Sequence, residues 1–340
     1  MSTFLSLVLA TTATVAPLRP ATVDGRATVT IDSARHEVVI RVGSFAIGKG
    51  GHGYGDHAAD APPPLARFEW PVDGWVRGAT LRYLDAAGRE LPATVGHHAN
   101  LINFGRRQLL YPAYERLASW GPETGAMMLP ATVGIPMQRG MPMGVTVYWH
   151  NHSGMAFPDV TVEIVAKWTP STARLRPVDV LIEYVNVVYP VGRSGTFDVP
   201  TGSSRQSASF TQPIDARILA AGGHLHDHAV AMALREAGGR QLFSLTAERQ
   251  ADGRVAAVER ILPGVRGDGI RLRAGRRYTL DGSYDNGSTA AVPDGGMVNL
   301  VMLVAPERPS DWPALDPDDP ELAIDLRYLL AHGRQGGGHH

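Results

Sequence analysis

Apolar and polar residues alternate with a period of two over most of this chain, in short runs that Gly, Pro, Asp and Asn interrupt. Side chains on a β-strand point alternately to opposite faces, so this pattern indicates strands with one buried face, as in antiparallel sheets. The sequence therefore predicts a mainly β protein. The clearest predicted strands are residues 27–31, 37–42, 144–149, 160–165, 180–188, 216–221, 278–284 and 297–304.

Helical periodicity is sparse. Residues 113–120 are expected to form a short helix. Residues 321–331 predict an amphipathic helix, which follows a stretch rich in Asp and Pro that begins at Pro309. Helices are thus expected to be minor elements beside the strands.

The strand pattern breaks in a way that predicts two domains. Residues 169–177 carry two prolines in a mixed polar run, with strand-like segments on either side. Each half then has about 130 to 150 residues, the size at which a β-sandwich or jelly roll closes a core. The predicted organisation is an N-terminal arm or signal segment (1–25), a β-sandwich (26–168), a linker (169–178), a second, tandem antiparallel β-sandwich (179–308) and a tail with a short helix (309–340).

The overall charge excludes some partners. Among 340 residues, 33 acidic residues nearly balance 32 Lys and Arg, so nothing suggests attraction to a polyanion, and nucleic acid is not an expected partner. The chain has no cysteine, which excludes disulfides, thiolate metal sites and cysteine nucleophiles. Any metal must therefore be held by His, Met, Asp or Glu. Arginine supplies nearly all the positive charge and Ala and Gly are abundant, as is typical of proteins from GC-rich bacterial genomes.

The N-terminal residues 4–16 are apolar and similar to the hydrophobic region of a secretory signal peptide, although no Lys or Arg precedes them. A signal segment would direct the protein to the periplasm or out of the cell, and the alternative is a frayed N-terminal arm. No other stretch has the roughly 18 apolar residues that a spanning helix needs, so no membrane-spanning segment is predicted.

Histidines are clustered along the chain. Seven of the thirteen fall in three short groups within or at the edge of predicted strands. A single histidine of this kind is more often hydrogen-bonded to a carboxylate or carbonyl than bound to a metal, but three groups together favour metal binding. The clustered histidines are His97, His98, His150, His152, His224, His226 and His228.

Strand geometry decides which of these histidines can share an ion. Residues two apart lie on the same face, so His224 and His226 can reach one metal without distorting the backbone. His228 would share that face if the strand continued straight, so a site of three histidines that binds zinc or iron is an alternative. His97 and His98 would point to opposite faces of a regular strand, and sharing an ion requires a bend there.

Other common metal and hydrolase patterns lack their motifs. A cupin-type iron site needs a carboxylate four or five residues after the H-x-H pair, where Val230 and Ala231 stand, and Glu236 lies too far along. Neither H-E-x-x-H nor G-x-S-x-G occurs, so zinc-protease and serine-hydrolase functions are not indicated. The sequence leaves open the roles of His52, His57, His152 and His228.

Several short motifs occur together in a recognisable order. They are residues 97–105 (HHANLINFG), Trp120 with residues 129–134 (LPATVG), residues 148–150 (YWH), residues 224–226 (HLH) and residues 296–300 (GMVNL). In order and spacing they resemble the paired-histidine strand, the W…LPxxVG segment, the third N-domain histidine, the H-x-H pair and the M-x-N-L strand of one family. That family is the copper- and ascorbate-dependent monooxygenases, which include the peptidylglycine α-hydroxylating and dopamine β-monooxygenases.

The resemblance implies two copper ions per chain. One, held by His97, His98 and His150, would store and deliver an electron. The other, held by His224, His226 and Met297, would bind dioxygen and be the catalytic centre. A thioether is a soft ligand that favours Cu(I), which agrees with a copper that meets oxygen while reduced. The alternative interpretation of Met297 is an ordinary core methionine.

The chain departs from the family around the implied substrate site. Peptide-hydroxylating members carry an arginine two residues before the H-x-H pair and a tyrosine four after the methionine, where this chain has Gly222 and Val301. Asn299 shares a strand face with Met297 and Val301, so it can line the same cleft. The resemblance therefore implies that these positions face a substrate that is less charged or more apolar than a peptide terminus.

The sequence thus predicts a copper-dependent monooxygenase that hydroxylates a C–H bond of a small organic molecule. Its other reactants would be O2 and a one-electron reductant such as ascorbate. The alternative is a non-catalytic copper-binding or carrier protein of the same fold, which the losses at Gly222 and Val301 support.

Overall fold

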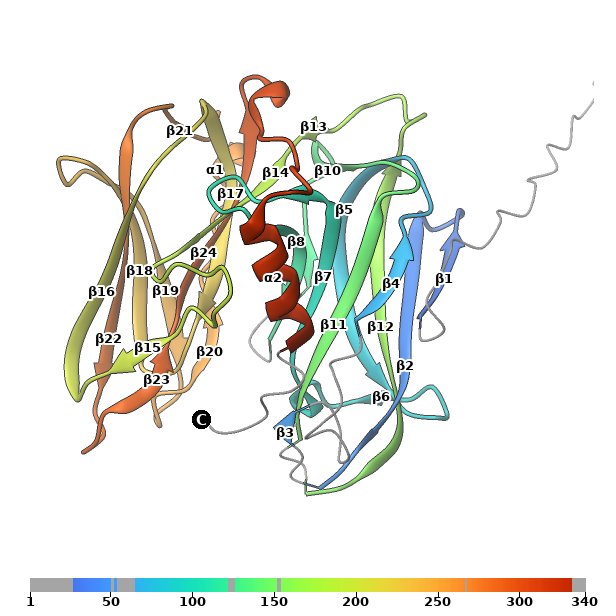
Figure 1. Ribbon diagram of the computed structural model, residues 1–340, viewed down its shortest axis with the longest axis horizontal. Helices are drawn as coiled ribbons and strands as arrows, with labels where there is room; N and C mark the ends of the chain where they lie inside the picture. The colour runs from blue at the N-terminus through green and yellow to red at the C-terminus, as the bar shows by residue number, and fades with distance from the viewer. Residues whose placement is uncertain are drawn as a thin grey trace, which may run out of the picture.

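The computed structural model describes residues 27–49, 52–53, 65–121, 126–151, 154–266 and 268–331. Over these residues the protein is mainly β and forms two β-sandwiches that follow each other along the chain (Figure 1). The fold class predicted from the alternation of apolar and polar residues is therefore confirmed. The predicted N-terminal arm or signal segment lies outside the described residues. No described helix combines the length and the apolar character needed to cross a membrane.

The N-terminal sandwich has two sheets, which comprise eight and five strands within the described residues. Their pairs are antiparallel except for a short parallel contact between β10 and β13. The larger sheet contains β1 (Ala27–Asp32), β2 (Glu37–Ile47), β12 (Phe157–Pro170), β5 (Gly74–Leu84), β10 (Val133–Met137), β13 (Val178–Asp179), β6 (Glu90–Leu91) and β9 (Met127–Met128). The smaller sheet contains β3 (His52–Gly53), β11 (Pro142–His150), β7 (Gly96–Arg107), β8 (Tyr114–Trp120) and β4 (Ala66–Glu69).

The core of this sandwich follows directly from the alternating sequence. On β2, Val38, Ile40 and Val42 are buried, whereas Arg41 between them is exposed. On β11 of the facing sheet, Val147 and Trp149 point into the same core. Each fully buried side chain of this kind stabilises the fold by about 1.5 to 3 kcal/mol relative to exposure.

The C-terminal sandwich is built in the same way from strands later in the chain. Its first sheet contains β14 (Leu181–Asn186), β24 (Val298–Pro306), β17 (Ala216–Leu225) and β21 (Ile270–Leu272). Its second contains β16 (Gly202–Thr211), β22 (Arg277–Asn286), β18 (Ala229–Glu236), β19 (Gln241–Arg249) and β20 (Val255–Val258). A separate pair joins β15 (Phe197–Val199) to β23 (Val292–Gly296), and a short helix, α1 (Pro263–Arg266), precedes β21.

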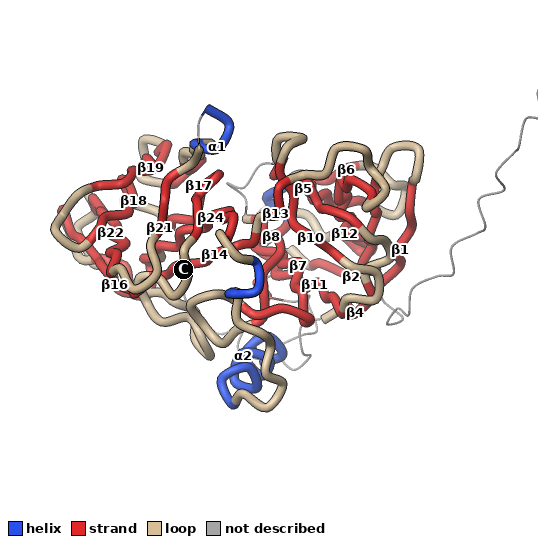
Figure 2. Tube along the Cα trace, turned by 90° about the horizontal axis from the view of Figure 1, so that it is seen from above, coloured by secondary structure: helices blue, strands red, loops and turns tan. Residues whose placement is uncertain are grey.

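The sheet that contains β24 and β17 is buried on both faces. Leu300 and Met302 of β24 lie in the core of the C-terminal sandwich, whereas Val301 and Leu303 pack against the core of the N-terminal one. The second of these two faces, which carries Val301 and Leu303, is called the interdomain face below. In the view of Figure 2, β17 and β24 of one sandwich lie on the side turned toward β7 and β8 of the other.

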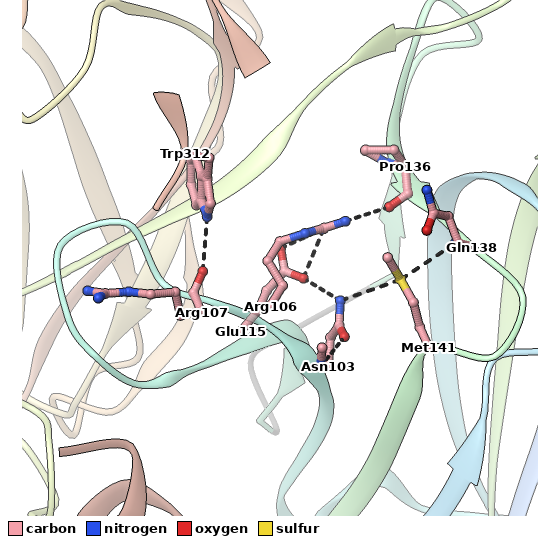
Figure 3. A network of polar contacts seen from close by, with 9 residues as sticks. Asn103, Arg106, Arg107, Glu115, Pro136, Gln138, Met141 and Trp312 are labelled. Atoms are coloured by element: carbon pink, nitrogen blue, oxygen red, sulfur yellow. Dashed lines mark hydrogen bonds and ion pairs between the residues drawn. The ribbon is translucent and has the colours of Figure 1, made fainter. Parts of the chain in front are cut away.

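Residues 113–120, predicted as a helix, form strand β8 instead, paired with β7. Glu115 of β8 is fully buried and accepts hydrogen bonds from Asn103 Nδ2 at 2.9 Å and Arg106 Nη1 at 3.0 Å, both on β7 (Figure 3). A helix would remove the Glu115 carboxylate from these partners and leave it buried without them, which is costly. Pairing with β7 therefore outweighs the weak local helical signal.

The chain between the sandwiches contains little regular structure. Strand β12 continues through Pro170, and residues 171–177 form neither strand nor helix. The following β13 pairs with β10 of the N-terminal sandwich before β14 enters the C-terminal one.

The tail folds back onto the N-terminal sandwich. The helix predicted at residues 321–331 is confirmed as α2 (Pro320–Ala331), which lies beside β8 (Figure 1). Asp325 of α2 forms an ion pair with Arg116 of β8. Earlier in the tail, Trp312 Nε1 donates to the Arg107 carbonyl at 3.0 Å (Figure 3). The tail thus connects the end of the second sandwich to the first.

A carboxyl group is buried in the C-terminal sandwich. Glu183 of β14 is fully buried, and Gln212 Nε2 donates to its Oε2 at 3.1 Å. Among the described residues, neither Glu183 Oε1 nor Gln212 Oε1 has a hydrogen-bond partner. Burial raises the pKa of Glu183 to about 7, although the Gln212 hydrogen bond opposes the shift. The folded protein therefore holds this carboxyl group neutral at pH values where an unfolded chain ionises it.

Replacing Glu183 with Gln is expected to stabilise the protein at pH 8 by about 1 to 3 kcal/mol and to have little effect at pH 4. Because the folded pKa lies above the unfolded one, the stability from the bound proton is complete at pH 4 and falls as the pH rises toward 7. The fall is about 1.4 kcal/mol per pH unit, and a neutral amide does not show it. Urea unfolding of both proteins at both pH values measures the difference; an equal shift at the two would contradict this role.

Candidate metal centre

Three histidines from the two sandwiches converge on one point. His98 lies on β7, His224 lies on β17, and His226 follows the end of β17. One ring nitrogen of each lies within 4.8 Å of the others, and all three side chains are half-buried. The ring centroids of His98 and His224 are 5.2 Å apart, and those of His224 and His226 are 5.0 Å apart. We call these three residues the histidine triad.

Two members of the triad, His224 and His226, lie on the interdomain face at the end of β17. Leu225 between them is 2% exposed and lies in the core of the C-terminal sandwich, so His224 and His226 point the opposite way. The His226 N–H donates to the Met297 carbonyl at 3.4 Å, which fixes the end of β17 beside the start of β24. Strand alternation therefore produces the H-x-H pair as the sequence predicts.

The third histidine of the triad is His98, not His228. After His226 the chain turns, and His228 has a φ of +66° in the left-handed region. Its N–H donates to the Gly253 carbonyl at 2.9 Å, and its ring lies against Gly253. The turn ends the strand, so His228 does not continue the face of His224 and His226. The alternative site of His224, His226 and His228 is therefore not formed.

The pairing of β7 with β11 shifts its register next to His98. Tyr148 of β11 pairs with His98, but the next residue, Trp149, pairs with Gly96, so the register shifts at His97. The shift coincides with the bend that the adjacent histidines were expected to need. Gly96 is required here, because a Cβ at this position would lie 1.8 Å from the hydroxyl oxygen of Tyr83.

The triad differs from the predicted grouping of ligands. The sequence analysis assigned His98 to an ion with His97 and His150, and His224 and His226 to a second ion. The structure instead brings His98 to His224 and His226, because the two sandwiches meet at this point. The side chains of His97 and His150 lie outside the described residues, as do all of His57 and His152. The backbone of His150 pairs with that of His52 across β11 and β3.

Met297 lies beside the triad. Its backbone N–H donates to the Tyr284 hydroxyl at 3.0 Å, and that hydroxyl donates to the Met297 carbonyl at 2.6 Å. Burial raises the pKa of Tyr284 above its ordinary value, so the phenol stays protonated and remains a donor. The same carbonyl accepts the hydrogen bond from His226, so the residue predicted as the sulfur ligand is adjacent in space to a member of the triad.

Asn299 also lies close to the triad. It is directly opposite His224 in the pairing of β24 with β17, and directly opposite residues of antiparallel strands share a face. Its Oδ1 is buried, and no described residue donates a hydrogen bond to it. A buried acceptor of this kind costs about 1 to 3 kcal/mol unless another group satisfies it. A molecule bound near His224 can supply the missing donor.

Gly222 and Val301, the two positions expected to face a substrate, pair with each other. Gly222 lies opposite Val301, one pair further along the same face. The space above Gly222 is bordered by Arg260, whose Cγ would be 3.4 Å from a Cβ at Gly222. Arg260 Nη1 donates to the Ala126 carbonyl of the N-terminal sandwich at 3.1 Å. Arg260 could not be identified from the sequence, because it follows β20 and is distant in the chain from every motif.

The donor set fits a copper or zinc ion. Imidazole nitrogen suits both metals, and no carboxylate belongs to the group among the described residues, which disfavours calcium and magnesium. With no cysteine in the chain, a blue-copper site is excluded. This donor set does not separate the two metals, because the contacts of Met297 with Tyr284 and His226 are made by its backbone.

Comparisons with known proteins do not identify a family. No protein-family model and no curated protein matches the chain. Among solved structures, the major capsid protein P2 of bacteriophage PM2 has 10% identity and a TM-score of 0.37, over 79% of this chain and 98% of that one. A chain of Sulfolobus turreted icosahedral virus has 13% identity and a TM-score of 0.38, over 88% and 99%. Similarities this low carry no argument about function.

Proposed function

We propose that this chain is a copper-dependent monooxygenase whose copper is held by the histidine triad. The reaction would be hydroxylation of a C–H bond in a small organic molecule, with O2 and a one-electron reductant such as ascorbate. The observation that carries the proposal is the convergence of His98, His224 and His226 at the boundary between the sandwiches, beside Met297.

The residues around the triad suit this chemistry. When bound, copper supplies the one-electron redox steps and a position for O2. His224 lies on strand β17, and His226 is held just after it by the hydrogen bond to the Met297 carbonyl. The Tyr284 hydroxyl fixes the backbone of Met297. Asn299 Oδ1 can accept a hydrogen bond from a substrate hydroxyl or a water molecule next to His224. The contribution of a protein to metal chemistry is to fix groups of this kind in position.

The surroundings favour a largely apolar substrate. Val301 offers only apolar surface beside Asn299, and Gly222 opposite it has no side chain. Arg260 borders Gly222, and its guanidinium is already hydrogen-bonded to the Ala126 carbonyl. A small molecule with a single polar group therefore suits the site better than a peptide.

The number of copper ions stays a prediction. One ion suffices for the triad, and a second would rely on His97 and His150, whose side chains lie outside the described residues. Copper per chain, measured after reconstitution and removal of excess metal, distinguishes one ion from two.

A copper-binding or carrier protein is a second candidate. It is favoured because His98 lies with His224 and His226, so both sandwiches can enclose a single ion. The two-copper arrangement would instead place one ion in each sandwich. Oxygen consumption by the copper-loaded protein with ascorbate discriminates the two functions. A carrier would bind copper stoichiometrically. After a chelator has removed free copper, it would consume no oxygen above the background rate.

Met297→Ala is expected to lower oxygen consumption by at least about tenfold, equivalent to 1.4 kcal/mol of activation free energy, while the protein retains copper through the triad. The reason is that loss of the thioether leaves three imidazoles, which bind copper but favour Cu(I) less. Oxygen-electrode assays with ascorbate and copper analysis of the same samples measure the two properties. Met232→Ala, a buried methionine of the C-terminal core, is the control for lost packing. Unchanged turnover in Met297→Ala would exclude the methionine from the reaction.

Copper is also expected to stabilise the folded protein, because the triad joins two domains. An ion that binds only the folded state stabilises it by about 2.7 kcal/mol at a free concentration 100 times its dissociation constant. Thermal unfolding with and without copper measures the increment. His98→Ala should remove it, although His98 belongs to the other sandwich from His224 and His226, and His228→Ala should keep it. An increment that survives His98→Ala would show that copper binds the C-terminal sandwich alone.

A further inference from the structure

Three tyrosines contact one another in a series that ends at the surface. Tyr184 on β14 contacts Tyr111 from the chain between β7 and β8, with ring centroids 6.0 Å apart. Tyr111 in turn contacts Tyr189, which follows β14, with centroids 5.5 Å apart. Both contacts are edge-to-face, so the three rings form a continuous series.

The inner end of this series lies on β14, which belongs to the same sheet as the strand that carries His224. Asn186 Nδ2 donates to the Tyr184 hydroxyl at 3.2 Å. Asn186 is opposite Asn299 in the pairing of β14 with β24, and Asn299 is opposite His224 in the pairing of β24 with β17. Two strand spacings of 4.7 to 4.9 Å separate the Asn186 and His224 backbones, which is about 10 Å. Tyr184 lies two residues before Asn186 on β14, so a single strand, β24, separates its strand from the one that carries His224.

The middle of the series is held in place by hydrogen bonds to backbone. Tyr111 is 9% exposed, and its hydroxyl accepts a hydrogen bond from the Asn186 N–H at 3.1 Å. The same hydroxyl donates to the Asn186 carbonyl at 3.4 Å. Tyr111 and Tyr184 thus both form hydrogen bonds with Asn186.

The outer end meets solvent and a carboxylate. Tyr189 is 42% exposed, and its hydroxyl donates to Glu321 of α2. Burial and then this hydrogen bond raise the pKa of Tyr189 above its ordinary value, so the phenol is protonated at neutral pH. A phenol that loses an electron must also release its proton, and Glu321 is the acceptor in contact with it.

Building on the proposed function, we infer that Tyr184, Tyr111 and Tyr189 form a one-electron relay between the copper at the triad and the surface at Glu321. The relay operates when reduced copper meets hydrogen peroxide with no substrate bound. It moves the oxidising equivalent away from the histidines and Met297, which are the groups most exposed to damage at the centre.

Reduction of one hydrogen peroxide molecule to water requires two electrons and two protons. Hydrogen peroxide takes one electron from Cu(I), which becomes Cu(II), and one from Tyr184, and two protons complete two water molecules. Tyr111 then reduces Tyr184, and Tyr189 reduces Tyr111, so that the radical ends as a neutral phenoxyl on Tyr189. Tyr184 and Tyr111 each regain on reduction the proton that they release on oxidation. The Tyr189 proton passes to Glu321 and then to solvent, and the centre takes two protons from solvent, so one proton is consumed in total.

Copper-loaded full-length protein tests the relay. The protein is reduced with ascorbate, freed of excess ascorbate, mixed with an equimolar amount of hydrogen peroxide and freeze-quenched. Electron paramagnetic resonance then reports Cu(II) and tyrosyl radical in one sample, and peptide mass spectrometry locates oxidised tyrosine. The relay predicts a tyrosyl radical with the oxidation product at Tyr189.

Tyr111→Phe is the decisive variant, because it keeps the ring contacts and removes the oxidisable phenol. Its Tyr189 product should fall to the level of the copper-free protein, while copper content and the Cu(II) signal stay at wild-type values. Tyr278→Phe, a buried tyrosine of the C-terminal core, should retain the wild-type yield. Since loss of the Tyr111 hydroxyl also removes two hydrogen bonds, Tyr189→Phe is a second variant, and it should shift the radical to Tyr111.

The outcomes separate the relay from the proposed function. Retained copper that is oxidised by peroxide, with no product at Tyr189 or with an equal product in Tyr111→Phe, overturns the relay and leaves the metal centre intact. A protein that holds no copper overturns both, because the relay then has no inner end.

Discussion

Replacing His98 with Ala is expected to weaken copper binding by at least about 100-fold, as much as replacing His224 or His226. Changes to groups that only orient metal ligands already cost 10- to 100-fold in affinity, and the loss of a direct ligand should reach or exceed that range. The three nitrogens lie within 4.8 Å of one another, so one ion can contact all three. Competition titration against a chelator of known copper affinity measures the dissociation constants.

His228→Ala provides the matched control for that result. It removes a histidine from the same segment, but one whose ring lies against Gly253 in the turn after β17. Its copper affinity should equal that of the wild type. If His98→Ala binds copper as tightly as the wild type while His224→Ala does not, His98 serves a different site, as the sequence alone predicts.

The second large effect is expected at the ion pair that holds the C-terminal helix. Asp325→Ala should lower the free energy of unfolding by about 3 kcal/mol, the lower end of the range for a fully buried pair, because it leaves the half-buried Arg116 guanidinium without its counter-ion. Asp325 is 1% exposed and accepts hydrogen bonds from Arg116 Nη1 at 2.9 Å, Arg116 Nη2 at 2.7 Å and the Tyr114 N–H at 3.0 Å. Burial acts to lower the pKa of Arg116, but Asp325 outweighs burial and raises it.

Urea unfolding measures this loss, and limited proteolysis within α2 shows whether the helix detaches. Asp311→Ala is the control, since its ion pair with Arg308 is exposed and such pairs contribute about 0 to 1 kcal/mol. Combining Asp325→Leu with Arg116→Met should recover much of the loss, because neither charge then remains buried. A change below 1 kcal/mol in Asp325→Ala would contradict the role assigned to this pair.

Local pattern was sufficient to predict most of the fold. Alternation on β2, where buried Val38 and Ile40 flank half-buried Val39, follows from the two faces of a strand and needs no knowledge of the partner. The helix α2 was likewise predicted from spacing. The mistake at residues 113–120 arose because the side chain that decides the conformation, Glu115, is satisfied by Asn103 and Arg106 of another strand.

The candidate site was predictable only within each sandwich. The spacing of His224 and His226 implies a shared face, and Asn299 follows from strand alternation. The position of His98 beside them depends on how two sandwiches pack, which no local pattern encodes. The turn that removes His228 from the site and the approach of Arg260 to Gly222 depend on the same long-range packing. Assignment of ligands to sites therefore required the structure.

One metal ion is proposed to join the two sandwiches through the triad. A crystal structure of the copper-loaded protein, with anomalous diffraction data at the copper edge, would locate that ion. An anomalous peak is expected with nitrogens of His98, His224 and His226 at about 2.0 to 2.1 Å, the usual distance from imidazole to such a metal. An ion bound by His224 and His226 alone, with His98 bound to a separate ion or to none, would contradict the proposal that one ion joins the two sandwiches.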